Sequence, residues 1–496
     1  MNRLARMAVL TLALLCAFTI GAGAAVARLL PPRLALFQMP QVAAGRLAPA
    51  GAVLPAASGA PGSARPQAGG TRASHDPATP AGVTARIAPI IASGDLGQHV
   101  GVLVTNLVTG RVLYSLNAAA GFTPASTTKL ATAVAALHVL GPGARFTTSV
   151  LAGATQARIV LAGGGDPTLA AGRYPAAGYP RPATLRSLAA ATARSLRARG
   201  VTSVRLSYDQ TLFSGPEQAA GWPVAGASDN YITSGNVAPI TGLEVDQGRL
   251  SRPGVPQDAD VAGTAPRSLT PGLDAARAFA RFLRKDKIAV TGQPSGTEVR
   301  ARGAVIAAVR SPALAQIVQW MLSESNNVIA ETLARQVALA TGRPATFSGA
   351  AAAVMAAAAR LGVTGIKLHD GSGLSPADVI SPRALVALIR LAAVAGRPAL
   401  RPAITGLPVA GFSGTLTPFP GAYFGGFGPA ALGTVRAKTG NLATVAALAG
   451  IAYARNGQLI AFAFMSDRLA KKGPALANAG AALARLATAL AGCGCR

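Results

Sequence analysis

The sequence is poor in acids, aromatic residues, lysine and cysteine, and each shortage narrows the functions to consider. Its four histidines are scattered, and no cysteine–histidine cluster has the spacing of metal ligands, so a metal enzyme is not expected. Aromatic residues make up 5% of the chain and no nucleic-acid-binding motif is present, so nucleic acid is not an expected partner. Cysteine is absent between positions 17 and 492, so the core must be stable without a disulfide.

The charge is unbalanced, with 18 acidic residues against 46 lysines and arginines and a net charge of +28. A high content of alanine, glycine, proline and arginine is typical of a GC-rich genome. Two explanations of the positive charge are therefore equally good: compositional drift, and attraction of the protein to an anionic envelope. Lysine is rare enough for each position to be considered, and the seven lysines are at 129, 285, 287, 367, 438, 471 and 472.

The N-terminus has the pattern of an export signal. Arg3 and Arg6 precede an apolar run that extends to about Ala27 and ends in small residues with Ala-x-Ala sites. The run is nearly long enough to span a bilayer, so residues 1–27 are either a cleaved signal peptide or a retained membrane anchor. Both alternatives predict export to the periplasm or the cell-wall side.

The rest of the chain divides by composition and periodicity. Strand-like segments occur near residues 99–117 and again from 434 to 466, and mostly helical segments lie between them. The terminal strands should share one sheet. We expect a Pro/Ala/Gly-rich linker at 28–85, an α+β domain from 86–148 plus 269–490, an inserted smaller domain at 149–268 and a tail at 491–496.

The segment "PASTTK" ends in one of the rare lysines. The pattern predicts a helix that Ser126 or Thr127 caps and that Gly141 ends. Ser126 and Lys129 would then lie on one face of this helix. A serine hydroxyl needs a base to become a nucleophile, and a lysine amine becomes one when burial lowers its pKa. Arginine stays protonated and cannot take this role.

Two further motifs support this chemistry. Ser325 and Asn327 lie in "SNN" at a break between two helical runs, and "KTG" at 438–440 lies on an expected strand. Chance Ser-x-x-Lys matches are common, on the order of 0.4 in such a chain, whereas Lys-Thr-Gly is expected on the order of 0.06 times. The order and placement of the three motifs match the penicillin-recognising serine enzymes.

The wider sequence resembles a particular family within that group. The segments "PASTTKL", "LAGGGDPTL", "SNNVIAETLAR", "DGSGLS", "LPVAGFSGTL" and "RAKTGNL" together resemble the class C low-molecular-mass penicillin-binding proteins, which are D-alanyl-D-alanine carboxypeptidases and endopeptidases. The resemblance covers about 88–486. It implies an α+β transpeptidase domain like that of penicillin-binding proteins and β-lactamases, with an antiparallel sheet flanked by helices and a smaller inserted domain. The nested second insertion of that class is missing or reduced near 247–268.

The resemblance also implies the role of each site residue. It makes Ser126 the acylated nucleophile and Lys129 its base, while Ser325 and Asn327 complete the proton network. The remaining implied roles are binding of the substrate carboxylate by Lys438 and Thr439, close approach of the substrate backbone at Gly440, and an oxyanion hole from the backbone N–H groups of Ser126 and Asn441.

These roles predict a serine-type D-Ala-D-Ala carboxypeptidase, with DD-endopeptidase activity as a second option. Its partners would be peptidoglycan peptides ending in D-Ala-D-Ala and β-lactam inhibitors, and neither a cofactor nor a metal is implied. The anionic cell envelope is a further candidate partner, and the membrane is one if the N-terminal segment is not cleaved.

Three alternatives stay open. A β-lactamase shares the motifs, but Glu331 is expected to pack or cap rather than activate water. A Ser/His/Asp hydrolase would use Ser372 beside His369, although neighbours in sequence rarely form a triad. A non-catalytic wall-binding protein fits the charge but gives no reason for lysines at 129 and 438.

Overall fold

The computed structural model describes residues 78–172, 178–223, 230–250, 265–418, 424–471 and 473–495. The expected signal or anchor at 1–27 and most of the linker lie outside these ranges. Helix α2 (Pro80–Ile91) begins inside the predicted linker, so the ordered part starts earlier than predicted. Thr79 caps this helix through its hydroxyl, and Pro80 suits the first helical position. Within the described ranges, no helix combines the length and the apolar character needed to cross a bilayer.

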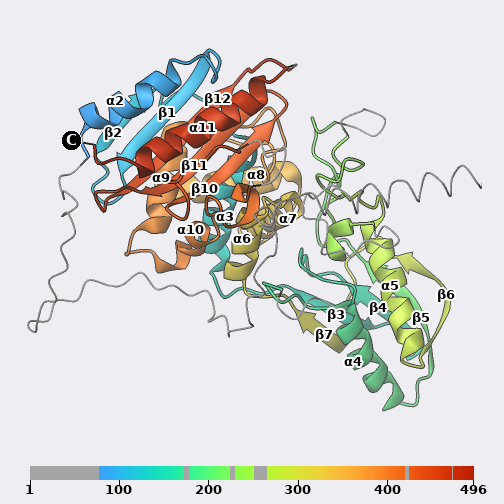
Figure 1. Ribbon diagram of the computed structural model, residues 1–496. Coiled ribbons are helices and arrows are strands. Elements are labelled where there is room, and N and C mark those ends of the chain that lie inside the picture. The colour runs from blue at the N-terminus through green and yellow to red at the C-terminus, as the bar shows by residue number, and fades with distance from the viewer. Residues whose placement is uncertain are drawn as a thin grey trace, which may run out of the picture. The chain divides into compact units, whose positions relative to one another are not determined.

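The central sheet has five antiparallel strands that come from both ends of the described chain (Figure 1). In spatial order they are β10 (Val435–Leu442), β11 (Val445–Tyr453), β12 (Leu459–Asp467), β1 (His99–Asn106) and β2 (Val112–Leu116). Strand β1 pairs with β12 along its whole length, from His99 opposite Asp467 to Asn106 opposite Ile460. The predicted shared sheet is therefore confirmed.

Helices cover both faces of this sheet. The helices of this part of the chain are α2, α3 (Lys129–Leu140), α6 (Leu314–Ser323), α7 (Asn327–Ala340), α8 (Phe347–Arg360), α9 (Pro382–Ala393), α10 (Pro402–Thr405) and α11 (Ala475–Ala491). One apolar core lies between the sheet and α2 with α11, and another lies between the opposite face and α3 with α6 to α9. Lys129 and Asn327 lie at the first positions of α3 and α7 in the second layer, whereas residues 438–440 lie on strand β10.

A second sheet is built from the middle of the chain (Figure 1). Its order is β6 (Ala289–Gly296), β5 (Ser203–Asp209), β4 (Arg158–Ala162), β3 (Thr147–Ala152) and β7 (Val305–Arg310). Helices α4 (Leu185–Arg197) and α5 (Pro271–Lys285) share its core. Because β6, β7 and α5 follow residue 268, this sheet extends beyond the predicted insertion. We propose that the inserted unit runs from 147 to 310.

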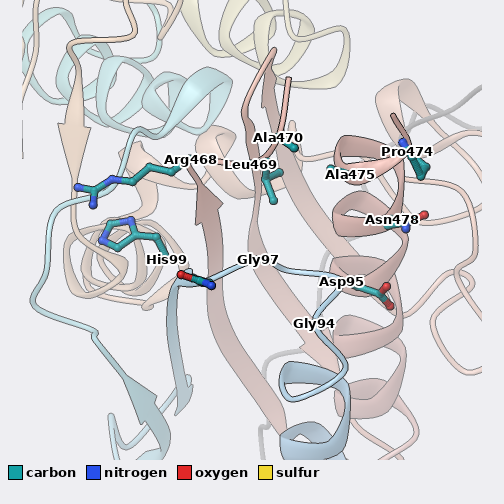
Figure 2. Close-up of a pocket in the computed structure, with 11 residues that line it drawn as sticks. Gly94, Asp95, Gly97, His99, Arg468, Leu469, Ala470, Pro474, Ala475 and Asn478 are labelled. Carbon is teal, nitrogen blue, oxygen red and sulfur yellow. The ribbon is translucent and has the colours of Figure 1, made fainter. Parts of the chain in front are cut away.

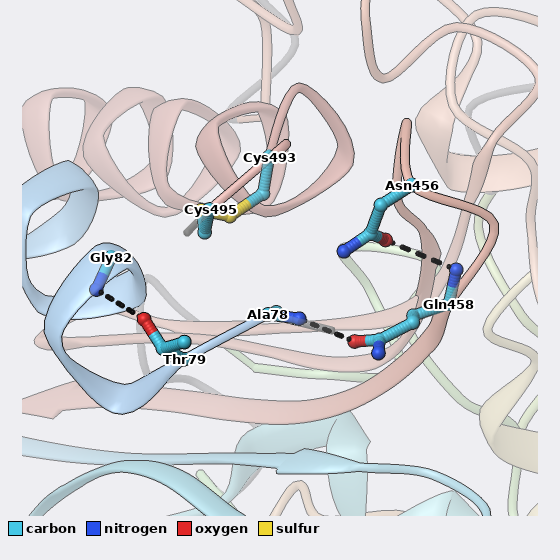
Figure 3. The surroundings of a disulfide bond; sticks show 7 residues. All are labelled: Ala78, Thr79, Gly82, Asn456, Gln458, Cys493 and Cys495. Atoms are coloured by element: carbon cyan, nitrogen blue, oxygen red, sulfur yellow. Dashed lines mark hydrogen bonds between the residues drawn. A yellow bond between two sulfur atoms is a disulfide. The ribbon is translucent and has the colours of Figure 1, made fainter. Parts of the chain in front are cut away.

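The end of the chain packs against the start of α2. Cys493 and Cys495 are buried and form a disulfide beside Thr79 (Figure 3). The peptide N–H of Thr79 donates to the carbonyl of Cys495 at 3.0 Å. Because the two cysteines are only two positions apart, their disulfide links no distant segments.

Candidate active site

The serine of the first motif lies on a 3₁₀ turn, η2 (Ala125–Thr128), directly before α3. The prediction that Ser126 or Thr127 caps the helix is wrong, because the Thr127 hydroxyl donates to the carbonyl of Pro124 and the Ser126 hydroxyl faces Lys129. Ala125 has φ of 47°, a conformation that is strained for a residue with a side chain. Ser126 therefore does not cap the helix. The turn holds it before the first residue of α3, where it stays partly exposed.

Lys129 is fully buried and its ammonium group contacts three oxygen atoms. Nζ lies 2.8 Å from the Ser126 hydroxyl, 2.6 Å from Oδ1 of Asn327 and 2.7 Å from the carbonyl of Ser372. The structure thus brings together the serine and lysine of the first motif and the asparagine of the second. It adds a backbone carbonyl that the sequence analysis did not assign.

Burial lowers the pKa of Lys129 to about 7, although the negative charges of Asp370 and Glu331 oppose the shift. An amine with this pKa is partly neutral at physiological pH. It can therefore accept a proton from a hydroxyl that it contacts. This is the property that the rarity of lysine suggested for this position.

A second cluster joins the other two motifs. The Lys438 ammonium on β10 donates to the Ser325 hydroxyl at 2.8 Å and to the carbonyl of Thr439 at 2.8 Å. The Thr439 hydroxyl lies 2.9 Å from that of Thr415. Burial, and then the nearby charge of Lys129, lower the pKa of Lys438 well below its usual value. The two lysines are therefore close enough to interact, and the three motifs form one site.

Gly440 is required by the protein's own packing. A Cβ atom at this position would lie 2.6 Å from the carbonyl oxygen of Pro124 and 3.2 Å from Thr127. The resemblance implied that this glycine makes room for the substrate backbone. The structure gives a different reason, because glycine lets β10 approach the turn that carries Ser126.

Asn441 lies near the end of β10, at the edge of the central sheet. β10 is an edge strand, and its outer edge pairs with residues 408–410: Ala437 donates to Pro408, and Val435 accepts from Ala410. Backbone groups alternate in direction along a strand, so the N–H and C=O groups of Thr439 and Asn441 lie on the same outer edge. That part of the edge is placed to pair with an extended peptide.

The inserted unit contributes to the second motif. Nδ2 of Asn327 donates to the carbonyl of Asn236 at 2.9 Å, and Nδ2 of Asn326 donates to Oε1 of Gln247 at 2.8 Å. Asn326 also caps α7, and the preceding Ser325 has φ of 55°. The sequence analysis missed Asn236 and Gln247, since no motif marks residues that act across such a separation.

The alternative triad at 369–372 is not formed. Ser372 is fully buried, and its hydroxyl accepts the peptide N–H of Leu374. His369 contacts Asp378, with 3.5 Å between Nδ1 and Oδ1. Glu331 is buried as well and accepts the peptide N–H groups of Gly371 and Ser372, which supports the prediction of a packing role. Among the described residues, no group of three histidine, cysteine, aspartate or glutamate side chains could hold a metal ion.

A cavity of about 690 Å³ lies at the end of the central sheet (Figure 2). Its lining includes His99, Arg468 and Asn478 but none of the predicted site residues in the part of the chain that the structure describes. His99 pairs with Asp467, whose other oxygen accepts the peptide N–H of Thr123 at 2.9 Å. The cavity is thus distinct from the site, although Asp467 anchors the segment that leads to Ser126.

Comparison with known proteins decides the family. The profile of the D-Ala-D-Ala carboxypeptidase 3 (S13) family matches residues 83–253 and 252–490. The chain belongs to this family. A carboxypeptidase of Mycobacterium tuberculosis is 39% identical over 431 residues, which cover 84% of this chain and 86% of that protein. The carboxypeptidase DacB of Mycolicibacterium smegmatis is 38% identical over 419 residues, covering 84% and 85%.

Solved structures agree on the fold of this S13 peptidase. Penicillin binding protein 4 from Haemophilus influenzae matches with a TM-score of 0.63 and 23% identity, over 82% of this chain and 98% of that one. Its complex with a β-lactam matches with a TM-score of 0.57 and 22% identity, over 80% and 98%. The predicted fold class and the predicted enzyme, a serine-type D-Ala-D-Ala carboxypeptidase of the penicillin-recognising group, are confirmed.

Proposed function

We propose that this S13 peptidase acts on peptidoglycan stem peptides ending in D-Ala-D-Ala through an acyl-enzyme on Ser126. The observation that carries the proposal is the contact of Ser126 with Lys129, because burial gives this lysine the pKa of a general base. Relatives named carboxypeptidases support the reaction class.

In the first step, neutral Lys129 takes the proton of the Ser126 hydroxyl while the oxygen attacks the carbonyl of the scissile peptide bond. The peptide N–H groups of Ser126 and Asn441 donate to the developing oxyanion, which is usually a large catalytic contribution. The leaving D-alanine amine receives a proton through Lys129 or Ser325. Water then hydrolyses the ester and frees the serine.

The substrate's terminal carboxylate is assigned to Lys438 and Thr439. Lys438 is buried, which lowers the pKa of its ammonium group, and a carboxylate that enters this site would favour the charged form and meet it with little competing water. The outer edge of β10 at 439–441 would pair with the extended peptide. Cleavage of cross-linked stems would use the same groups, with a longer leaving amine in place of D-alanine.

Two other functions are less well supported. One type of β-lactamase needs a carboxylate beside the serine to activate water. Here the carboxylate of Glu331 instead accepts hydrogen bonds from the peptide N–H groups of Gly371 and Ser372. A wall-binding protein without activity would need no buried lysine against a serine hydroxyl.

We also propose that the protein is exported and acts on the cell-wall side, since its substrate class lies there. The expected signal or anchor at 1–27 supports this location. The net charge of +28 would favour contact with an anionic envelope. A β-lactam is expected to acylate Ser126 as a substrate mimic.

The test is incubation of the purified protein with fluorescent penicillin, beside a Ser126→Ala variant, with intact mass spectrometry of the adduct. Release of D-alanine from a peptide ending in D-Ala-D-Ala is measured in parallel. A stable adduct that is lost in the variant, together with D-alanine release, is expected. Rapid turnover of penicillin without an adduct would point to the β-lactamase, and a folded protein that does neither would point to the wall-binding function.

A further inference from the structure

A loop at residues 369–375 contacts the ammonium group of Lys129 as well. The carbonyl of Ser372 and Oδ1 of Asn327 accept from Lys129 at 2.7 and 2.6 Å. Both oxygens can only accept hydrogen bonds. When Lys129 is neutral, its two N–H groups stay on these oxygens and its lone pair is directed at the Ser126 hydroxyl. The position of the Ser372 carbonyl therefore sets the direction of the base.

Two buried carboxylates hold this carbonyl in place: Glu331 accepts the peptide N–H of Ser372 at 2.8 Å, and Asp370 binds the loop at more points. Oδ1 of Asp370 accepts the peptide N–H groups of Ser372 at 3.1 Å and Gly373 at 2.7 Å. Its Oδ2 accepts the peptide N–H of Ser375 at 2.7 Å and the indole N–H of Trp222 at 2.9 Å. Four donors thus fix one side chain, and one of them comes from the inserted unit.

The loop has little freedom to adopt another position. Glu331 accepts the peptide N–H of Gly371 at 2.9 Å, and the Thr132 hydroxyl donates to the carbonyl of Gly371 at 2.6 Å. A Cβ atom on Gly373 would lie 1.9 Å from the carbonyl oxygen of Ala125, on the turn of the nucleophile. A shift of the loop would therefore disturb the base and the nucleophile together.

Trp222 is itself well fixed. It is 4% exposed, and its ring packs edge-on against Phe347 at 5.1 Å and Tyr231 at 6.3 Å between centroids. Taking the proposed function as its basis, we propose that Asp370 and Trp222 are positioning residues that aim Lys129 at Ser126. The inserted unit then helps to set the geometry of the general base.

Asp370 also carries a charge that gives this role a distinct readout. Its negative charge raises the pKa of Lys129 against the stronger effect of burial, so removing it should lower that pKa. Burial, then Asp370, raise the pKa of Asp378 to about 10, so Asp378 holds its proton at neutral pH. The charged and titratable side chains around Lys129 and Asp370 include Glu331, Asp378, Lys438 and, beyond Glu331, Arg335. His369 is a further one, with its Nδ1 3.5 Å from Oδ1 of Asp378.

The experiment compares Asp370→Asn with Asp378→Asn in the full-length protein. Acylation by fluorescent penicillin is measured from about pH 5 to about pH 9. For Asp370→Asn we expect a plateau at least about tenfold lower and a midpoint shifted down by about 0.5–1 pH unit. Asp378→Asn replaces a protonated, neutral carboxyl group with a neutral amide, so its pH profile of acylation should keep the parent's midpoint. A folded Asp370→Asn protein with the parent's plateau and midpoint would refute the inference.

A second variant and a second readout keep the test decisive. If Asp370→Asn does not fold, Trp222→Phe should release D-alanine with kcat several-fold lower and KM unchanged, and an unchanged kcat would overturn the proposal. The pKa of Lys129 is also measured by NMR of protein with ¹³C-labelled lysine, with Lys129→Arg for assignment. If the parent is not acylated at all, the proposed function fails. In that case the NMR midpoint in Asp370→Asn still shows whether Asp370 acts on Lys129, and an unchanged midpoint would overturn the inference.

Discussion

At the scale of single residues, the site depends on one lysine whose environment changes its chemistry. Lys129 is buried against acceptor oxygens from three different segments. Burial favours the neutral amine, and the adjacent carboxylates limit that effect. The same side chain on the surface would be a permanent cation. The sequence could identify this lysine, but only the fold supplies its basicity.

Replacement of Lys129 by arginine should separate charge from basicity. Arginine keeps the positive charge but cannot accept a proton, so acylation by fluorescent penicillin should slow by about 10²–10⁴-fold. Lys367→Arg is the matched control, because Lys367 is exposed on the short strand β8 (Ile366–Lys367). A Lys129→Arg protein that acylates within about threefold of the parent would show that this lysine is not the base.

The pH dependence of acylation should follow the same residue. Lys129 must be neutral to act, and its pKa is lowered to about 7. The acylation rate should therefore increase as pH increases through about 7 and reach a plateau above it. Stopped-flow measurement of the second-order rate constant with a chromogenic β-lactam gives this profile. A midpoint near the ordinary lysine value would contradict the assignment.

The sequence predicted the residues of the three motifs but not the groups that hold them. Ser126, Lys129, Ser325, Asn327 and Lys438 could be found because their spacing and local structure are visible along the chain. The partners Asn236, Gln247 and Ser372 act through backbone carbonyls or a side-chain amide from distant segments. A backbone carbonyl has no sequence signature, so these contacts could not be predicted.

At the scale of elements, the active site depends on how closely β10 approaches the turn η2. Gly440 allows this close approach, because it has no side chain to lie between the strand and the carbonyl of Pro124. Gly440→Ala should push the two elements apart by a few tenths of an ångström or more. We expect acylation to fall by about tenfold or more, because the two proposed oxyanion donors, the N–H groups of Ser126 and Asn441, lie one on each element.

Gly143→Ala is the control for this prediction, since a Cβ atom there would meet nothing within 4 Å. Thermal unfolding of both variants is recorded beside the acylation rate. A loss of acylation in Gly440→Ala with nearly unchanged stability supports the positional argument. Normal acylation in a folded Gly440→Ala protein would contradict it.

Helices and strands were predicted well where a local pattern specifies them. The strand-like segments near 99–117 and from 434 to 466 match β1 with β2 and the three strands β10 to β12. Membership of a sheet is a different matter. Strands β6 and β7 pair with β5 and β3, which lie far away in sequence, so their alternating residues could not show which sheet they join.

At the scale of the whole described chain, the first helix and the last helix cover the same face of the central sheet. Helices α2 and α11 share one apolar core with β1, β11 and β12. Folding of this layer therefore needs segments from both ends of the described chain. The contacts of Ala78 and Thr79 with Gln458 and Cys495 close this layer (Figure 3).

The disulfide at the end of the chain should contribute little to this layer. Cross-linking stabilises a protein mainly by restricting the unfolded chain, and the effect grows with the length of the closed loop. Cys493 and Cys495 are separated by one residue, so we expect a change to alanine at both positions to cost only about 1–2 kcal/mol in the free energy of unfolding. Urea unfolding of the parent and the double variant measures this cost, and reduction of the parent should reproduce most of it.

Acylation of Ser126 should stay unchanged, since the catalytic contacts involve neither cysteine. A loss of several kcal/mol would mean that the packing of the tail against Thr79, and not the cross-link, stabilises the face formed by α2 and α11.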